Sequence, residues 1–593
     1  MAMRKIVPSL ALLMATGILM SGDPAPGRYY SPDLLASLDP VNKVRNLCGG
    51  KNGAASMRDK LALAAAFAPA ASGARVQLYD DLGKIHFPIT TSSPVAQRYF
   101  DQGLALAYGF NHAGAIASFR EAQRIDPRCA LCFWGEALAY GPNINAPMDP
   151  ATNARAVGLA RYADWLSRGA MPVEQALTAA MMRRYSPDPA ADQPALNAAY
   201  ADAMLAAAAA HPAHDDVSLL AAEAAMDTRP WDYWMADRKT PQPRLDDGVQ
   251  LVETVLARNP AHPQASHLYI HLMENGPDPR RAEAAADRLA APLAPKAGHL
   301  VHMPAHIYYR LGRWRDSLRV NLAAAQVDEE WIKASGDRGL MRYGYYPHNI
   351  HFIVTSAQMA GDMGTAISHA TKLEQMLDPA VSAKIAWVQA IHASPYFAAA
   401  QFATPERILA MHAPDPRLPY AIAMHHYARA VARARQRDRA GFDREMAKLR
   451  AIRDGQAVQS MIDQGVPARD LMQLAEAVAT ARWAYANGRY GRAEKLYRQA
   501  IALEDKIPYM EPPFWYYPVH QSLGAALYRQ GRYDDAAQAF TQALAQSPNN
   551  GWVLYGLAAS QRARGYGAEA AAADAAQKRA WAGDPRWLRM DRL

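Results

Sequence analysis

The chain has 593 residues, of which half are hydrophobic and a fifth are charged. This composition excludes a disordered or collagen-like protein, and the length favours several domains or an elongated array of repeats over one compact core. The net charge of +8 is small for this length, and basic and acidic residues alternate, as in REAQR at 120–124. We therefore expect a solvated helical surface without a nucleic-acid-binding face.

The N-terminus is predicted to be an export signal. Arg4 and Lys5 precede an apolar run from Ile6 to Met20, which is short for a membrane-spanning helix and typical of a secretory signal. We expect residues 1–22 to be this signal and the protein to be periplasmic. An uncleaved membrane anchor is the alternative, and no other long apolar run predicts a membrane span in the mature chain.

The segments that follow differ in character. Residues 23–90 contain several proline and glycine residues and are expected to form an irregular N-terminal segment. Beyond them, alanine-rich stretches favour helices, and the alternating pattern of half-buried strands is scarce. The expected fold class is therefore all-α.

A pattern of small residues, aromatics and proline recurs along the helical part. It is clearest in HQSLGAALYRQGRYDDAAQAFTQALAQSPNN at 520–550, which includes Gly524, Gly531, Tyr533 and Phe540. This stretch resembles the tetratricopeptide repeat, a helical hairpin of about 34 residues. In that family, small residues let two helices approach closely and aromatics fill the space between them. The resemblance implies a curved solenoid of stacked hairpins.

Further copies of the repeat depart from the pattern in places. Residues 103–127 keep Phe119 but have Phe110 where the family usually has glycine. Other copies occur at 481–503 and 299–317, a weaker one at 348–366, and a distorted one around His267. We expect five helical regions: N-terminal repeats at 91–150, a divergent helical region at 151–260, His-rich repeats at 261–380, divergent helical repeats at 381–475 and C-terminal repeats at 476–593.

Histidines are concentrated in the middle of this array. Eight of the 18 histidines lie between His262 and His351, and seven of the eight fall at helical spacing, so that each set points one way from its helix. The repeat register that the family implies places them on the helix positions that line its concave groove. We expect three successive repeats to direct these side chains, with one carboxylate, into a shared centre: His267, His271, Glu274, His299, His302, His306, His348 and His351.

Such a set of imidazoles with a carboxylate predicts a transition-metal site for copper, zinc or iron. Eight donors exceed what one tetrahedral site needs, so one catalytic metal with an open position and two metals are both compatible with it. If the protein is an enzyme, we expect metal-dependent hydrolysis or oxidation of a small molecule or peptide in the groove, with Arg310 orienting the substrate. The alternative is a scaffold without metal, in which hydrogen-bonded histidines line a groove that binds a protein or peptide.

Cys129 and Cys132 form a CxxC motif. The next residue is Phe133 rather than histidine, which excludes covalent haem attachment, and no second CxxC completes a four-cysteine zinc site. A local disulfide and a soft-metal pair both remain open. Together, the stretches FNHAGA at 110–115, HLVHMPAHIYYR at 299–310 and PHNIHF at 347–352 resemble a group of exported bacterial tetratricopeptide-repeat proteins, a resemblance that implies no particular reaction.

Overall fold

The computed structural model describes residues 76–145, 147–188, 190–237, 239–276, 278–291, 293–337 and 339–593. Within these ranges the chain forms helices and no strand beyond an isolated bridge between Trp234 and Pro241, which confirms the all-α prediction. The predicted signal at 1–22 lies outside the described residues, as does most of 23–90. Among the helices described, none has the length and apolar character needed to cross a membrane.

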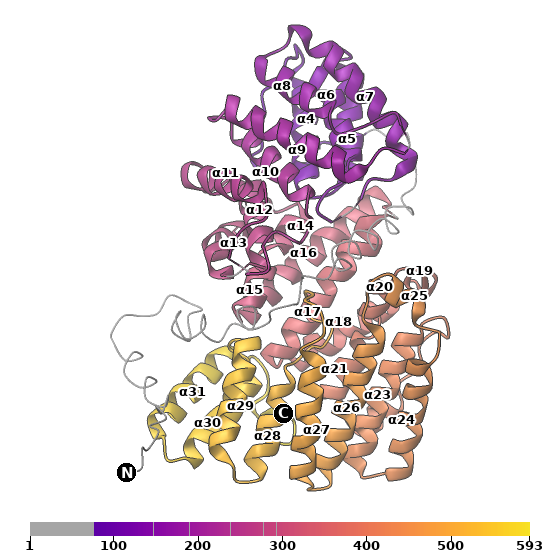
Figure 1. Cartoon of the computed structure of the whole chain (residues 1–593), viewed down its shortest axis with the longest axis vertical. Helices are drawn as coiled ribbons and strands as arrows, with labels where there is room; N and C mark the ends of the chain where they lie inside the picture. Colours follow the sequence, from indigo (N-terminus) through magenta and orange to yellow (C-terminus); the bar gives the residue numbers. More distant parts are fainter. Residues whose placement is uncertain are drawn as a thin grey trace, which may run out of the picture.

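The N-terminal half is a succession of helices, most of which pack against their neighbours in sequence (Figure 1). Capping side chains fix several helix starts: Ser93 accepts a hydrogen bond from the backbone N–H of Ala96, and Asn111 accepts one from Gly114. The helices are α4 (Pro94–Tyr108), α5 (His112–Ile125), α6 (Ala130–Tyr140), α7 (Asn153–Leu166), α8 (Pro172–Met181), α9 (Gln193–Ala210), α10 (Asp215–Asp227), α11 (Leu245–Arg258), α12 (Pro263–Glu274) and α13 (Glu283–Ala290).

The central helices carry most of the predicted histidines. The first helix of the repeat at 299–317 is divided in two, because Pro304 has no backbone N–H to continue the hydrogen-bonding pattern. The central helices are α14 (Gly298–His302), α15 (Pro304–Arg310), α16 (Trp314–Ser335), α17 (Tyr346–Ala360) and α18 (Met363–Met376), and a short π-helix at Met341–Tyr345 leads into α17.

The C-terminal half continues the solenoid, and its last six helices stand in a row, each packed on the next (Figure 1). A long loop of residues 505–518, which we call the aromatic loop, connects α27 to α28. The helices are α19 (Pro379–Lys384), α20 (Ala386–Ile391), α21 (Ser394–Phe402), α22 (Pro405–Leu409), α23 (Pro419–Gln436), α24 (Arg439–Asp454), α25 (Gln459–Asp463), α26 (Ala468–Ala486), α27 (Tyr490–Glu504), α28 (Val519–Arg529), α29 (Tyr533–Gln546), α30 (Gly551–Ala563) and α31 (Gly567–Ala580).

One packing motif occurs in both halves: an aromatic ring fits against glycines on the helices before and after it. Its residues are Gly103, Phe119 and Gly135 in the first half and Gly524, Phe540 and Gly556 in the second. Each glycine stands sixteen residues from its ring. A Cβ atom added at any of the four glycines would lie between 2.4 and 2.7 Å from the ring, so close helix approach requires glycine there.

Two hydrophobic cores meet near the middle of the chain. The first draws its buried residues from between Leu82 and Ala360, and the second from between Ala325 and Leu593. Helices α16 and α17 contribute side chains to both cores. The histidine-bearing helices therefore lie where the two halves of the molecule join.

Candidate metal centre

Six of the seven predicted histidines come together at this junction, from helices α12, α14, α15 and α17. They form two groups, in each of which one ring nitrogen from every member lies within 4.8 Å of the others. All are buried except His348, which is partly exposed. We call them the first triad, which is His267, His271 and His299, and the second triad, which is His302, His306 and His348.

The first triad has nitrogen positions that suit a shared metal ion. The Nε2 atoms of His267 and His299 are 3.2 Å apart. Two nitrogens bound to one tetrahedral zinc at about 2.0–2.1 Å would lie roughly 3.3 Å from each other. The Nδ1 of His267 is 2.9 Å from the amide oxygen of Gln264, so Nδ1 carries the proton and the Nε2 lone pair faces the triad.

The third member, His271, leaves a nitrogen without a partner. Its Nδ1 donates to Glu274 Oε1 at 2.7 Å, which leaves the lone pair on Nε2. That Nε2 is buried and has no hydrogen-bond partner, and the same is true of Nδ1 of His299. Buried polar atoms are nearly always paired, so these two atoms call for an explanation. A cation at the centre of the triad would supply one for His271.

The second triad is held by similar outer contacts. His302 donates from Nδ1 to Asn321 Oδ1 at 2.6 Å, and its Nε2 is 2.9 Å from the Nε2 of His306. The Nδ1 of His306 lies 2.6 Å from Glu274 Oε2 and 2.9 Å from Glu511 Oε2. The ring centroid of His348 is 4.9 Å from that of His302. The contacts of Asn321 with His302 and of the two glutamates with His306 therefore hold the two rings with their Nε2 atoms facing each other.

Glu274 connects the two triads. Its Oε1 accepts from His271, and its Oε2 faces His306. A carboxylate on the outer nitrogen of an imidazole fixes the ring and raises its basicity as a ligand, and this contact is common at metal sites. These contacts favour an orienting role for Glu274. Its predicted role as a direct ligand stays a prediction, compatible with a third possible grouping of Glu274, His306 and Glu511.

Electrostatics keep most of these rings neutral. Burial lowers the pKa of five imidazoles, those of His267, His271, His299, His302 and His348. A histidine must be neutral to bind a metal, so these five rings are ready to act as ligands at neutral pH.

His306 is the exception. Burial alone would lower its pKa, but the carboxylates of Glu274 and Glu511 outweigh burial and raise the pKa of His306 to about 10. In return, although burial opposes it, His306 and His271 lower the pKa of Glu274 to about 2. Without a metal, His306 is therefore a cation enclosed by two acidic side chains.

Aromatic rings cover both triads. The Phe110 ring centroid lies 4.8 Å from His267 and 5.1 Å from His299, and Phe352 lies 5.0 Å from each ring of the second triad. Phe110 has φ of +53°, a left-handed conformation that costs a non-glycine residue about 1–2 kcal/mol. A strained residue thus replaces the family's glycine and covers the first triad.

Besides Glu274, two predicted residues lie outside the triads. The Nε2 of His351 is 2.6 Å from the hydroxyl of Tyr516, so the structure does not bring this ring to the metal-ligating groups. Arg310 donates from Nη1 to the backbone oxygen of Glu274 at 2.6 Å, and its guanidinium lies 5.6 Å from the ring centroid of Tyr509. The substrate-orienting role of Arg310 stays a prediction.

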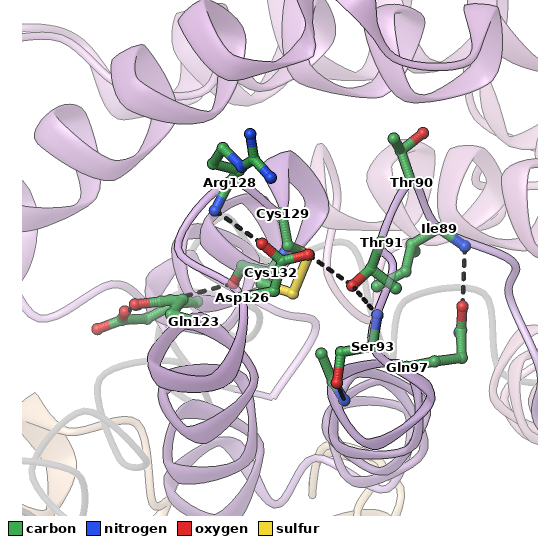
Figure 2. Close-up of a disulfide and its surroundings, with 12 residues drawn as sticks. Ile89, Thr90, Thr91, Ser93, Gln97, Gln123, Asp126, Arg128, Cys129 and Cys132 are labelled. Carbon is green, nitrogen blue, oxygen red and sulfur yellow. Dashed lines mark hydrogen bonds between the residues drawn. A yellow bond between two sulfur atoms is a disulfide. The ribbon is translucent and has the colours of Figure 1, made fainter.

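Cys129 and Cys132 form a disulfide at the start of α6 (Figure 2). Both are buried, and the sulfur of Cys129 accepts a hydrogen bond from the backbone N–H of Cys132. Of the two alternatives for this motif, the structure contains the local disulfide rather than the soft-metal pair. Asp126, beside the pair, accepts from the Thr91 hydroxyl and the Arg128 backbone N–H, which fixes the turn between α5 and α6.

Sequence reasoning missed several residues that orient the histidines. Glu511 lies on the aromatic loop, about 200 residues from its partner His306, so no local spacing connects them. Gln264 and Asn321 have no motif of their own. The substitution of Phe110 for the family's glycine was visible in the sequence and was the one available signal for the cover of the first triad.

One segment of the C-terminal half is similar to a known family of repeats. Residues 517–550, which span α28 and α29, match the family model described as "Tetratricopeptide repeat". The chain therefore contains a tetratricopeptide repeat at these residues. No curated protein matches the sequence.

Several solved structures are similar to this chain at a low level. The human IFIT1 dimer with m7Gppp-AAAA is 11% identical with a TM-score of 0.28, over 83% of this chain and 91% of that one. The Cut9-Hcn1 hetero-tetramer of APC/C is 14% identical with a TM-score of 0.21, over 82% and 97%. The P58(IPK) TPR domain is 11% identical with a TM-score of 0.20, over 79% and 98%. Similarity at this level carries no information about function.

Proposed function

We propose that this protein is an exported metal-binding protein whose two histidine triads each hold one transition-metal ion. The observation that carries the proposal is the buried Nε2 of His271, which has no hydrogen-bond partner. His271 belongs to a group in which one ring nitrogen of each histidine lies within 4.8 Å of the others. A hydrogen bond between His267 and His299 would account for their facing Nε2 atoms without a metal. It leaves the lone pair of His271 unexplained.

Outer-shell contacts support the same proposal. Gln264, Glu274 and Asn321 each accept from the Nδ1 of a different histidine, and this selects the tautomer with a free Nε2. A hydrogen-bonded core needs no such common orientation. Imidazole donors suit copper, zinc and iron and disfavour magnesium and calcium.

The donor count bears on chemistry. Three protein ligands leave a fourth position open on each ion, which is typical of catalytic rather than structural zinc sites. An ion with an open position can activate water for hydrolysis or bind dioxygen for oxidation. We therefore extend the proposal to a metalloenzyme with two neighbouring centres and leave the reaction class open.

We also propose that the protein works in the periplasm. The basic and apolar N-terminus supports export, and the disulfide between Cys129 and Cys132 suits an oxidising compartment. Fractionation of cells that produce the full chain would test it, since recovery of the protein in the cytoplasm would contradict export.

Elemental analysis of the purified full chain tests the metal proposal. We expect one ion per triad in the wild-type protein. The double variant His271→Ala/His299→Ala should lose the ion of the first triad, and His302→Ala/His348→Ala that of the second. His351→Gln is the matched control, because His351 shares helix α17 with His348 but bonds to Tyr516; it should keep both ions.

A chain that binds no metal would contradict the proposal. Protein that contains no copper, zinc or iron, and takes up none when each is added, would overturn the metal proposal. If such protein then bound a partner equally well with and without chelator, the scaffold alternative would replace it.

A further inference from the structure

A pocket of about 200 Å³ lies beside the second triad. The aromatic loop forms much of its wall, and the C-terminal ends of α12, α15, α17, α27 and α29 form the rest. Glu511 lines the pocket and also contacts His306, so one side chain joins the pocket to the centre. A molecule bound here would lie next to the second triad.

The walls of this pocket are mainly aromatic. Tyr309, Tyr509, Phe514, Trp515 and Tyr516 all line it. Flat rings on several sides favour a flat, largely apolar ligand, through stacked and edge-to-face contacts. Pockets for drug-sized ligands run from about 300 to 1,000 Å³, so this smaller volume suits a molecule with a single ring.

Two lining residues contribute buried polar atoms that have no hydrogen-bond partner. They are Nε1 of Trp515, which can only donate, and Oε1 of Gln546, which can only accept. Buried polar atoms are nearly always paired, so these two atoms call for a partner. A hydroxyl group both accepts and donates, so one ligand hydroxyl has the chemistry to satisfy both atoms.

We propose that this pocket binds single-ring phenols beside the metal centre. That the phenol is a substrate rests on the proposed function; that it binds rests on the pocket alone. A carboxylate is the competing ligand chemistry, because Arg310 also lines the pocket. A carboxylate can accept from Trp515 but offers no hydrogen to Gln546.

Calorimetric titration of the full chain with 4-methylphenol, toluene and benzoate tests this. The titration is done on metal-loaded protein and on protein freed of metal by a chelator. We expect 4-methylphenol to bind in both states and to bind about tenfold more tightly than toluene, as one net hydrogen bond would provide. Equal affinity for toluene, or tighter binding of benzoate, would overturn the proposal.

Conservative variants locate the site. Trp515→Phe keeps a ring and removes the N–H, and Gln546→Leu removes the acceptor; each should weaken 4-methylphenol binding several-fold and leave toluene binding unchanged. Trp331→Phe is the matched control, because Trp331 also has a buried, unpartnered Nε1 but lies against Tyr79, outside the pocket. If Trp515→Phe does not fold, Gln546→Leu decides. Unchanged phenol affinity in the folded variants would contradict the assignment.

The two proposals fail separately. Phenol binding by a chain that takes up no copper, zinc or iron when each is added would leave the pocket assignment standing and refute the metal centre. A chain that holds metal but binds no 4-methylphenol in either state would refute the pocket assignment and leave the metal centre.

Discussion

The repeat at α4–α6 and the repeat at α28–α30 share one scaffold and differ at one turn. In both, the turn residue stands seven positions after the first packing glycine and has positive φ: +53° at Phe110 and +74° at Gly531. Nothing lies within 4 Å of a Cβ added at Gly531, whereas the ring of Phe110 contacts three histidines. The comparison teaches that a departure from the repeat, rather than the repeat itself, marks the candidate site.

A second departure appears in the central repeat. Asp328 of α16 and Ser547 stand sixteen residues after their turn glycines, Gly312 and Gly531. Asp328 is 1% exposed; its Oδ2 accepts from Asn349 Nδ2 at 2.6 Å, and its Oδ1 has no partner. A buried acid thus replaces a small polar residue beside the histidine-bearing helices.

Replacing that acid should give the largest effect. Burial raises the pKa of Asp328 to about 8, against about 3.9 in the unfolded chain. Because the folded state holds the proton more tightly, its stabilising contribution is complete below about pH 4 and is lost as pH rises to about 8, at roughly 1.4 kcal/mol per unit. Asp328→Asn should therefore be more stable than wild type at pH 8.5, by up to about 5 kcal/mol.

Urea unfolding at several pH values measures this difference. We expect the advantage of the variant to shrink steadily between pH 8 and pH 5. Parallel stability curves for the two proteins across that range would show that Asp328 does not titrate as described.

Removing the packed phenylalanine of either repeat should give the next largest effect. Phe119 and Phe540 are both fully buried against paired glycines. Phe119→Ala and Phe540→Ala should each destabilise their own region by about 3–5 kcal/mol. Hydrogen exchange, which resolves local opening, should show the loss near α4–α6 for the first and near α28–α30 for the second. If the two variants lose very different amounts of local stability, the two packing sites are not equivalent.

Exchanging the turn residues should give the smallest change in stability. It tests most directly whether Phe110 distinguishes the first repeat from the last. Gly531→Phe should cost about 1–2 kcal/mol of stability, because a side chain is strained at positive φ, and should leave metal content unchanged. Phe110→Gly relieves the same strain but uncovers the first triad, and should weaken metal binding by about 10- to 100-fold, as loss of an outer-shell contact does. Competition with a chelator measures both affinities. If Phe110→Gly binds metal as tightly as the wild-type protein, the Phe110 ring does not contribute to the metal site.

The sequence determined the helical hairpins and the direction of the histidines. Sixteen-residue spacing between glycine and aromatic, and three- and four-residue spacing between histidines, are local properties of a helix with 3.6 residues per turn. They were sufficient to predict an all-α fold and to predict that six of the seven histidines lie close together. His351 had the same spacing from His348, but a neighbouring tyrosine from the aromatic loop pairs with it instead.

Only the tertiary structure decided how the histidines divide and what surrounds them. The division into two triads, the bridging position of Glu274 and the approach of Glu511 depend on how α12, α14, α15, α17 and the aromatic loop pack at the junction of two cores. These contacts join residues as much as 205 positions apart. Helical periodicity fixes the direction of a side chain from its own axis, and only packing fixes which other chain segment it meets.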